Sequence, residues 1–162
     1  MIRILSLAFL LTGCTVNYTF TAADTGDAKS ISVQTFQLEA PLAPAGLNQQ
    51  FTEALRDLML AQTKVDVKNS GGDLQYTGAI TGYDVKPVGI QGNDQAGQNR
   101  LTIRVTVTYT NTLEPDKSFD SSFSRFADYG SDQQLSDVET ALIDEIFEQL
   151  TQDVFNRSLG NW

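Results

Sequence analysis

Residues 100–110 read RLTIRVTVTYT and form the most regular stretch of the 162-residue chain. Arginine and threonine alternate there with apolar residues, which are Leu101, Ile103, Val105, Val107 and Tyr109. Because successive side chains of a strand point to opposite faces, this alternation predicts a strand with one buried and one solvated face. Such a strand is typical of an antiparallel sheet that is covered on a single side.

A second strand is expected directly after this one. Glu114–Lys117 places Pro115 at the second position of a type I turn, which suits a hairpin connection. The partner strand is predicted over Lys117–Tyr129, with Phe119 and Phe123 on one face.

Two further strands are expected upstream. Leu74–Val85 follows a turn cluster at 69–73 and is rich in Tyr, Thr and Ile, while Gly78 and Gly82 favour close approach by another backbone or side chain. Ser30–Leu38 (SISVQTFQL) alternates but changes phase midway, which is compatible with a strand that contains a bulge.

Two amphipathic helices complete the pattern. Leu47–Gln62 follows a proline-containing connection and carries one apolar stripe, made of Leu47, Phe51, Ala54, Leu55, Leu58 and Ala61. The last helix is expected to start at Ser136, which forms a capping box with Glu139. Its apolar residues then recur every four positions, at Val138, Leu142, Ile146, Leu150 and Val154.

These elements predict a single α+β domain over residues 30–162, in the order β-α-β-β-β-α. We expect roughly four strands in a mostly antiparallel sheet, with both helices packed on one face. No sequence repeat suggests a second domain.

The N-terminus has the layout of a secretory signal peptide. Met1–Arg3 supplies a positive charge, and Ile4–Leu11 is an apolar run too short to span a bilayer. Residues 11–14 read LTGC, which resembles a bacterial lipobox and implies cleavage between Gly13 and Cys14 with acylation of Cys14. The alternative is a buried N-terminal strand with the cysteine in the core.

The lipobox interpretation divides the chain into a cleaved signal peptide at 1–13, a lipidated tether at 14–29 and the domain. Several acyl chains on one residue anchor a protein stably to a membrane. Thr15 follows the cysteine where inner-membrane lipoproteins of enteric bacteria carry aspartate, so the resemblance implies the outer membrane.

The composition excludes several classes of function. The chain has no histidine and one cysteine, so it cannot form a histidine-based catalytic triad, an internal disulfide or a thiolate zinc site. Lys and Arg total 11 against 20 Asp and Glu, a formal net charge of -9 that opposes nucleic-acid binding. We therefore expect no enzyme, no metal and no cofactor beyond the covalent lipid.

Two acidic clusters have simple structural explanations. Residues 128–139 (DYGSDQQLSDVE) have the length of a calcium loop but lack its ligand at position 3 and its glycine at position 6. Asp144, Glu145 and Glu148 lie off the apolar stripe of the last helix. This acidic face is expected to meet water or a basic partner.

The connection at 86–99 is long for a hairpin, and long loops are often functional. It carries the apolar residues Val88 and Ile90, and the basic residues Lys86, Arg100 and Arg104 lie at its ends or beyond. These residues are either scattered surface positions or a local contact for an anionic ligand.

A set of short stretches adds a family resemblance. They are residues 47–57 (LNQQFTEALRD), 72–74 (GDL), 78–83 (GAITGY), 99–103 (NRLTI), 123–126 (FSRF), the terminal helix through 156, and 161–162 (NW). Their order and spacing, together with the lipobox, resemble the LptE lipopolysaccharide-assembly lipoproteins, in particular the shorter form typical of Bacteroidetes-type bacteria.

The resemblance implies a sheet of about four strands with two helices, and an outer-membrane lipoprotein that plugs the lumen of the LptD β-barrel and helps insert lipopolysaccharide into the outer leaflet. Enteric members bind lipopolysaccharide through basic residues of the sheet. The candidates for contact with barrel or lipopolysaccharide are therefore Lys86, Val88, Ile90, Arg100, Arg104 and Arg125.

The strong negative charge favours the plug over a carrier of an anionic glycolipid, since any such contact must be local or bridged by cations. The alternative function is a periplasm-facing envelope adaptor without a barrel partner.

Overall fold

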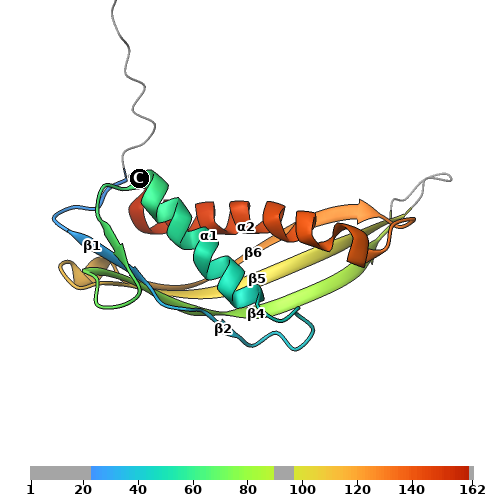
Figure 1. Ribbon diagram of the computed structural model, residues 1–162, viewed down its shortest axis with the longest axis horizontal. Helices are drawn as coiled ribbons and strands as arrows, with labels where there is room; N and C mark the ends of the chain where they lie inside the picture. Colours follow the sequence, from blue (N-terminus) through green and yellow to red (C-terminus); the bar gives the residue numbers. More distant parts are fainter. Residues whose placement is uncertain (1–22, 90–96, 161–162) are drawn as a thin grey trace, which may run out of the picture.

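A mixed sheet carries two helices on one of its faces (Figure 1). The computed structural model describes residues 23–89 and 97–160. In chain order, its elements there are β1 (Ser30–Val33), β2 (Gln37–Leu38), α1 (Leu47–Gln62), β3 (Asp66–Lys68), β4 (Leu74–Val88), β5 (Gln98–Asn111), the 3-10 turn η1 (Pro115–Lys117), β6 (Phe119–Gly130) and α2 (Leu135–Leu159). The predicted α+β fold is confirmed, with six strands in place of about four.

The sheet has the order β3-β1-β4-β5-β6, and β2 pairs with β4 beside this path. The long strands β4, β5 and β6 form an antiparallel meander, while the short strands β1, β2 and β3 join by parallel pairs. The hairpin between β5 and β6 turns at Pro115, as the sequence predicts.

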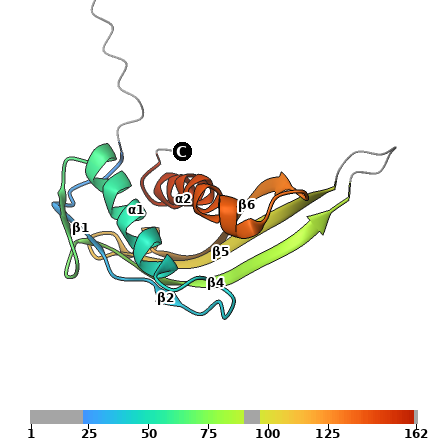
Figure 2. The same cartoon turned by 45° about the vertical axis from the view of Figure 1, so that its right-hand side comes forward.

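The predicted one-sided burial of β5 is confirmed. Every odd residue from Leu101 to Tyr109 is at most 2% exposed, and the residues between them are half-buried or exposed. Both helices cover this face (Figure 2). The helices also contact each other, since the rings of Phe51 and Phe147 meet edge to face at 5.2 Å.

The bounds of α1 agree with the prediction, but its stripe does not. Ala54 and Leu58 are only half-buried and Ala61 is exposed, while Thr52 and Met59 lie fully in the core. The reason is that the buried side of α1 faces the sheet, and α2 covers the predicted stripe only in part.

The strand with a bulge that was predicted over 30–38 is confirmed in its pairing but not in its continuity, since its two parts both pair in parallel with β4. It is divided into β1 and β2 because Phe36 turns into the core, where its N–H donates to the Thr52 hydroxyl at 3.0 Å. The strand β3 was not predicted, because three residues that pair with one edge leave little periodicity.

The predicted capping box is also wrong. Gln134 occupies the N-cap of α2 and makes no side-chain cap bond, so Ser136 lies inside the first turn. Glu139 instead accepts a hydrogen bond from the hydroxyl of the buried Tyr83.

Both predicted close approaches to glycine are confirmed. A Cβ at Gly78 would lie 2.0 Å from the carbonyl oxygen of Thr106, and one at Gly82 would lie 2.8 Å from Nη1 of Arg104. The register of β4 shifts between these two glycines. Before the shift the even-numbered residues Leu74 and Tyr76 are buried, and after it the odd-numbered Tyr83 is buried.

The domain is elongated, and its two ends differ. At one end the Asp24 N–H donates to the Leu159 carbonyl at 2.9 Å, which places the first described residues beside the C-terminus of α2. The end of β4 and the start of β5 lie at the other end (Figure 1). Neither helix of the described residues has the length and apolar character needed to cross a membrane.

Candidate functional site

The side of the sheet opposite the helices has no covering element within the described residues, and we call it the open face. The strand register brings together on it the even-numbered residues of β5 with their neighbours on β4 and β6. They include Asp84 and Lys86 on β4, Arg100, Thr102, Arg104, Thr106 and Thr108 on β5, and Asp120, Ser122, Ser124, Phe126 and Asp128 on β6.

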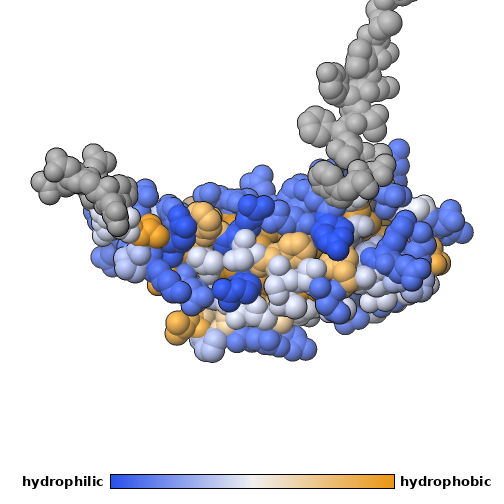
Figure 3. Space-filling model, turned by 180° about the vertical axis from the view of Figure 1, so that it is seen from behind, coloured by the Kyte–Doolittle hydropathy of each residue, from blue (hydrophilic) through white to orange (hydrophobic). Residues whose placement is uncertain are grey.

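Two pairs of polar side chains on the open face bond across β5 and β6. The hydroxyls of Thr106 and Ser122 are 3.1 Å apart across β5 and β6, and Thr108 donates to the Asp120 carboxylate one pair further along. Figure 3 shows the molecule from behind, along the flank of the sheet and with the open face turned downward; pale and orange surface lies there between blue hydrophilic residues. The cross-strand bonds keep the open face compatible with water, and the face still offers many hydrogen-bonding groups.

One basic residue of the open face is held in a fixed position. Arg100 donates two hydrogen bonds to Asp128, at 2.7 and 2.8 Å, and its guanidinium carbon lies 3.6 Å from the ring centroid of Phe126. This pair raises the pKa of Arg100 and lowers the pKa of Asp128 below its ordinary value. Phe126 remains 47% exposed beneath the guanidinium, so the cluster presents both apolar and charged surface.

Two other basic residues of this face have no such partner. Lys86 is directly opposite Arg100, and Arg104 is opposite Gly82, across which its side chain lies. Both are exposed, and neither takes part in the ion pairs of the described chain. They leave uncompensated positive charge on an acidic protein.

The structure separates the remaining predicted residues. Arg125 pairs in register with Ile103 and therefore lies on the helix side, where it binds Asp153 of α2 with two hydrogen bonds of 2.6 Å. Val88 ends β4, half-buried, opposite Gln98. Ile90, Gly13 and Cys14 lie outside the described residues.

The sequence reasoning missed two features of this face. Phe126 could have been found from parity, because Phe119 and Phe123 share the other face of β6. The second is a cavity of about 430 Å³ beside β2, lined by Gln34, Gln37, Thr77 and Thr106 among others. The only feature of the sequence that indicates this cavity is the break in the alternation of apolar and polar residues within 30–38.

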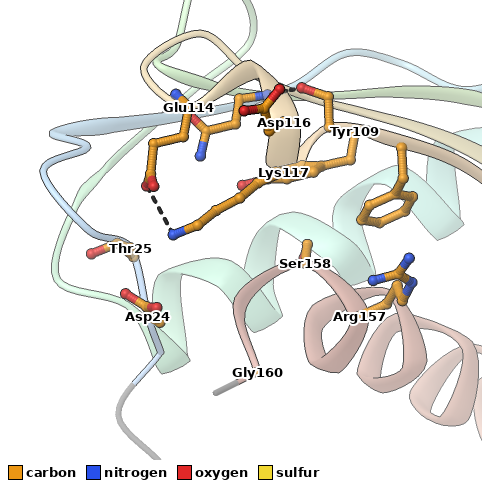
Figure 4. Close-up of a pocket in the computed structure, with 12 residues that line it drawn as sticks. Asp24, Thr25, Tyr109, Glu114, Asp116, Lys117, Arg157, Ser158 and Gly160 are labelled. Carbon is orange, nitrogen blue, oxygen red and sulfur yellow. Dashed lines mark hydrogen bonds and ion pairs between the residues drawn. The ribbon is translucent and has the colours of Figure 1, made fainter. Parts of the chain in front are cut away.

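A separate cavity of about 340 Å³ lies at the end of the domain where α2 terminates (Figure 4). Its two basic side chains have internal partners: Lys117 binds Glu114 at 2.9 Å, and the Arg157 guanidinium carbon lies 4.8 Å from the ring centroid of Phe119. The described residues contain no cluster of three acidic, cysteine or histidine side chains that could hold a metal.

Comparison with known proteins identifies the chain. A model of the LptE family, described as lipopolysaccharide-assembly, matches residues 28–158. The chain belongs to the LptE family. The resemblance noted in the sequence is thereby confirmed, and membership assigns the chain a part in lipopolysaccharide assembly as a lipoprotein that is not an enzyme.

Several solved structures are similar to this LptE-family chain. They include a minor lipoprotein from Acinetobacter baumannii (17% identity, TM-score 0.48, 81% of this chain and 95% of that one). A hypothetical protein from Chlamydia trachomatis has 10% identity and a TM-score of 0.51, covering 82% of this chain and 99% of that one. The rare lipoprotein B from Shewanella oneidensis has 11% identity and a TM-score of 0.43, covering 79% and 89%. At such identities the likeness concerns the fold alone. No curated protein matches the sequence.

Proposed function

We propose that this LptE-family protein is an outer-membrane lipoprotein that plugs an LptD-type β-barrel and helps to assemble it for lipopolysaccharide insertion. The observation that carries the proposal is the open face, a broad hydroxyl-rich side of the sheet that no element of the described chain covers. Because the chain belongs to the LptE family, we assign the open face a role in lipopolysaccharide assembly.

The chemistry of the open face suits the wall of a barrel. The lumen of an outer-membrane barrel is lined with polar side chains. A plug therefore needs many modest polar contacts, and the cross-strand pair of Thr106 and Ser122 can exchange its internal bond for bonds to such a wall. Phe126 beside Arg100 adds an aromatic and cationic anchor of the kind enriched at protein interfaces.

The distribution of charge supports a plug more than a free glycolipid carrier. The mature chain would lose Arg3 and keep 10 basic residues against 20 acidic ones, so it repels an anionic lipid at long range. Lys86 and Arg104 are the local exception on the open face. These two residues would bind the phosphates of lipopolysaccharide only at short range, after the lipopolysaccharide has reached the barrel.

The proposed lipid anchor also limits the orientation. Nine residue steps separate Cys14 from Ala23, and an extended chain of that length spans at most about 30 Å. Because Asp24 binds Leu159, the C-terminal end of α2 stays within that reach of the membrane surface. The other end, with Lys86 and Val88, is then the part that extends furthest from the anchor.

Co-purification tests the proposal. The tagged full-length lipoprotein, extracted from membranes in neutral detergent, should recover one large outer-membrane barrel. Thr106→Arg places a long cation on the open face and should reduce that recovery several-fold, whereas Thr140→Arg on the exposed side of α2 should not. Depletion of the lipoprotein should leave the barrel misassembled and lower surface lipopolysaccharide. Recovery of soluble proteins alone, with unchanged surface lipopolysaccharide, would support the adaptor alternative.

A further inference from the structure

The helix side of the domain carries a groove between α1 and α2, which we call the interhelix groove. Its volume is about 390 Å³, and its floor is formed by Ala54, Leu58, Ala61 and Phe147. The two alanines keep the floor low, and the ring of Phe147 closes it by packing against Phe51. This is the part of the α1 stripe that the sequence predicts as core and the structure leaves partly uncovered.

The rim of the groove is acidic on both sides. Asp57 stands on α1, and Asp144 and Glu148 stand on α2. Asp144 accepts one hydrogen bond from the Gln50 amide across the groove, at 2.9 Å. None of the three carboxylates takes part in the ion pairs of the described chain, whereas Asp153, one turn or more further along α2, is paired with Arg125.

We propose that the interhelix groove binds a basic amphipathic helix of a partner protein. An apolar floor between two helices accepts the apolar face of a third helix by the helix-in-groove mode. The uncompensated rim carboxylates would then meet lysine or arginine residues beside that apolar face. A floor of alanines allows the incoming backbone to come close.

Charge complementarity selects this occupant over two others. A second copy of the chain would bring further negative charge to the same rim, given the net charge of -9. The segment that precedes the described domain, residues 15–22 (TVNYTFTA), contains no basic residue and so leaves the rim uncompensated.

The groove and the open face lie on opposite sides of the sheet, so the two proposed contacts use different surfaces of the domain (Figure 2). The inference therefore stands independently of the proposed barrel contact. It assigns the helix side to a second protein of the envelope.

A photoreactive peptide tests the inference. The probe is a synthetic amphipathic helix with leucine on one face, lysine on the other and a benzophenone side chain on the apolar face, and the matched control peptide carries glutamate for lysine. Each is irradiated with the full-length lipoprotein in neutral detergent, and crosslinked residues are mapped by mass spectrometry. We expect the lysine peptide to label residues 54–61 and 144–151, and the glutamate peptide to label neither.

Paired variants separate the groove from general acidity. The double change Asp57→Asn with Glu148→Gln should weaken labelling about fivefold, since two exposed charge pairs are removed. Glu53→Gln with Glu145→Gln removes the same charge from exposed positions of the same helices outside the groove and should leave labelling unchanged. An equal loss in both double variants would overturn the inference. So would labelling of the groove by the glutamate peptide, or lysine-peptide labelling that appears only after residues 15–22 are deleted, which would make the tether the occupant.

Discussion

Arg100 and Asp128 face each other across β5 and β6 and share two hydrogen bonds, at 2.7 and 2.8 Å. The carbon of the same guanidinium lies over the ring of Phe126, 3.6 Å from its centroid. This geometry fixes one cation of the open face and leaves Lys86 and Arg104 as its uncompensated positive charges. The open face thus presents one ion-paired cation beside two exposed cations, within a surface of hydroxyl groups.

The ion pair predicts a measurable change in titration. Because Arg100 holds the pKa of Asp128 below its ordinary 3.8, Arg100→Gln should raise that pKa toward the ordinary value. A lowered folded-state pKa stabilises the protein above the unfolded pKa, so this contribution is lost as the pH falls below about 4. NMR titration of the Asp128 carboxyl carbon checks the shift. Arg104→Gln is the control and should leave the titration of Asp128 unchanged.

The one-sided sheet predicts opposite outcomes for two adjacent residues. Val105 is fully buried under the helices, so Val105→Asp places an unpaired charge in the core and should lower the free energy of unfolding by several kcal/mol, about 3 or more. Thr106→Asp, on the open face, should cost about 1 kcal/mol or less. Denaturant unfolding of both variants provides the comparison. Equal losses would mean that both faces are covered.

Gly78 predicts a steric limit in the centre of the sheet. A Cβ there would overlap the Thr106 carbonyl and come within 2.7 Å of the Phe36 ring, so Gly78→Ala should destabilise the domain by about 1–3 kcal/mol. Gly89→Ala adds the same methyl group where no atom of the described residues beyond its chain neighbours lies within 4 Å, and the stability of this variant should be nearly unchanged. Thermal unfolding of the pair measures the difference; a tolerated alanine at position 78 would show that β4 and β5 can move apart.

The long elements were predictable because periodicity records burial directly. The alternation of β5 and the four-residue steps of α2 each reflect one buried face, and both were located correctly. The short strands β1, β2 and β3 were not, because their pairing depends on where Phe36 enters the core and not on local pattern. The capping box failed for a similar reason, since Tyr83, from a strand 56 residues away, binds Glu139.

In the candidate site, too, local periodicity predicted some features, and others depend on tertiary packing. Parity along β5 and β6 was enough to place Arg100 and Arg104 on one face. Parity along β6 also places Arg125 with Phe119 and Phe123, on the face opposite to the other basic candidates. Its partner Asp153 on α2 could not be predicted, because the packing of the helix on the sheet decides that contact. The interhelix groove could not be foreseen, because a helical stripe does not reveal how much of it a neighbouring helix covers.

The lipid anchor gives a prediction at the N-terminus. Intact mass of the membrane-extracted protein should show the loss of residues 1–13 and the addition of acyl chains on Cys14. Cys14→Ala should release the protein from the membrane without changing its circular dichroism, because Cys14 lies outside residues 23–160, which contain the described helices and strands. An uncleaved chain with a free thiol would contradict the assignment.

Site-specific photocrosslinking in living cells tests whether the open face contacts the inner wall of an outer-membrane barrel. A photoreactive residue at position 88, at the end of β4, should capture one large outer-membrane protein. A photoreactive residue at position 104, on the open face, should capture the same protein. The same residue at position 145, exposed on α2 and outside the groove, should capture it several-fold less. Equal capture from 104 and 145, or capture of soluble proteins alone from 104, would show that the open face does not contact the barrel wall.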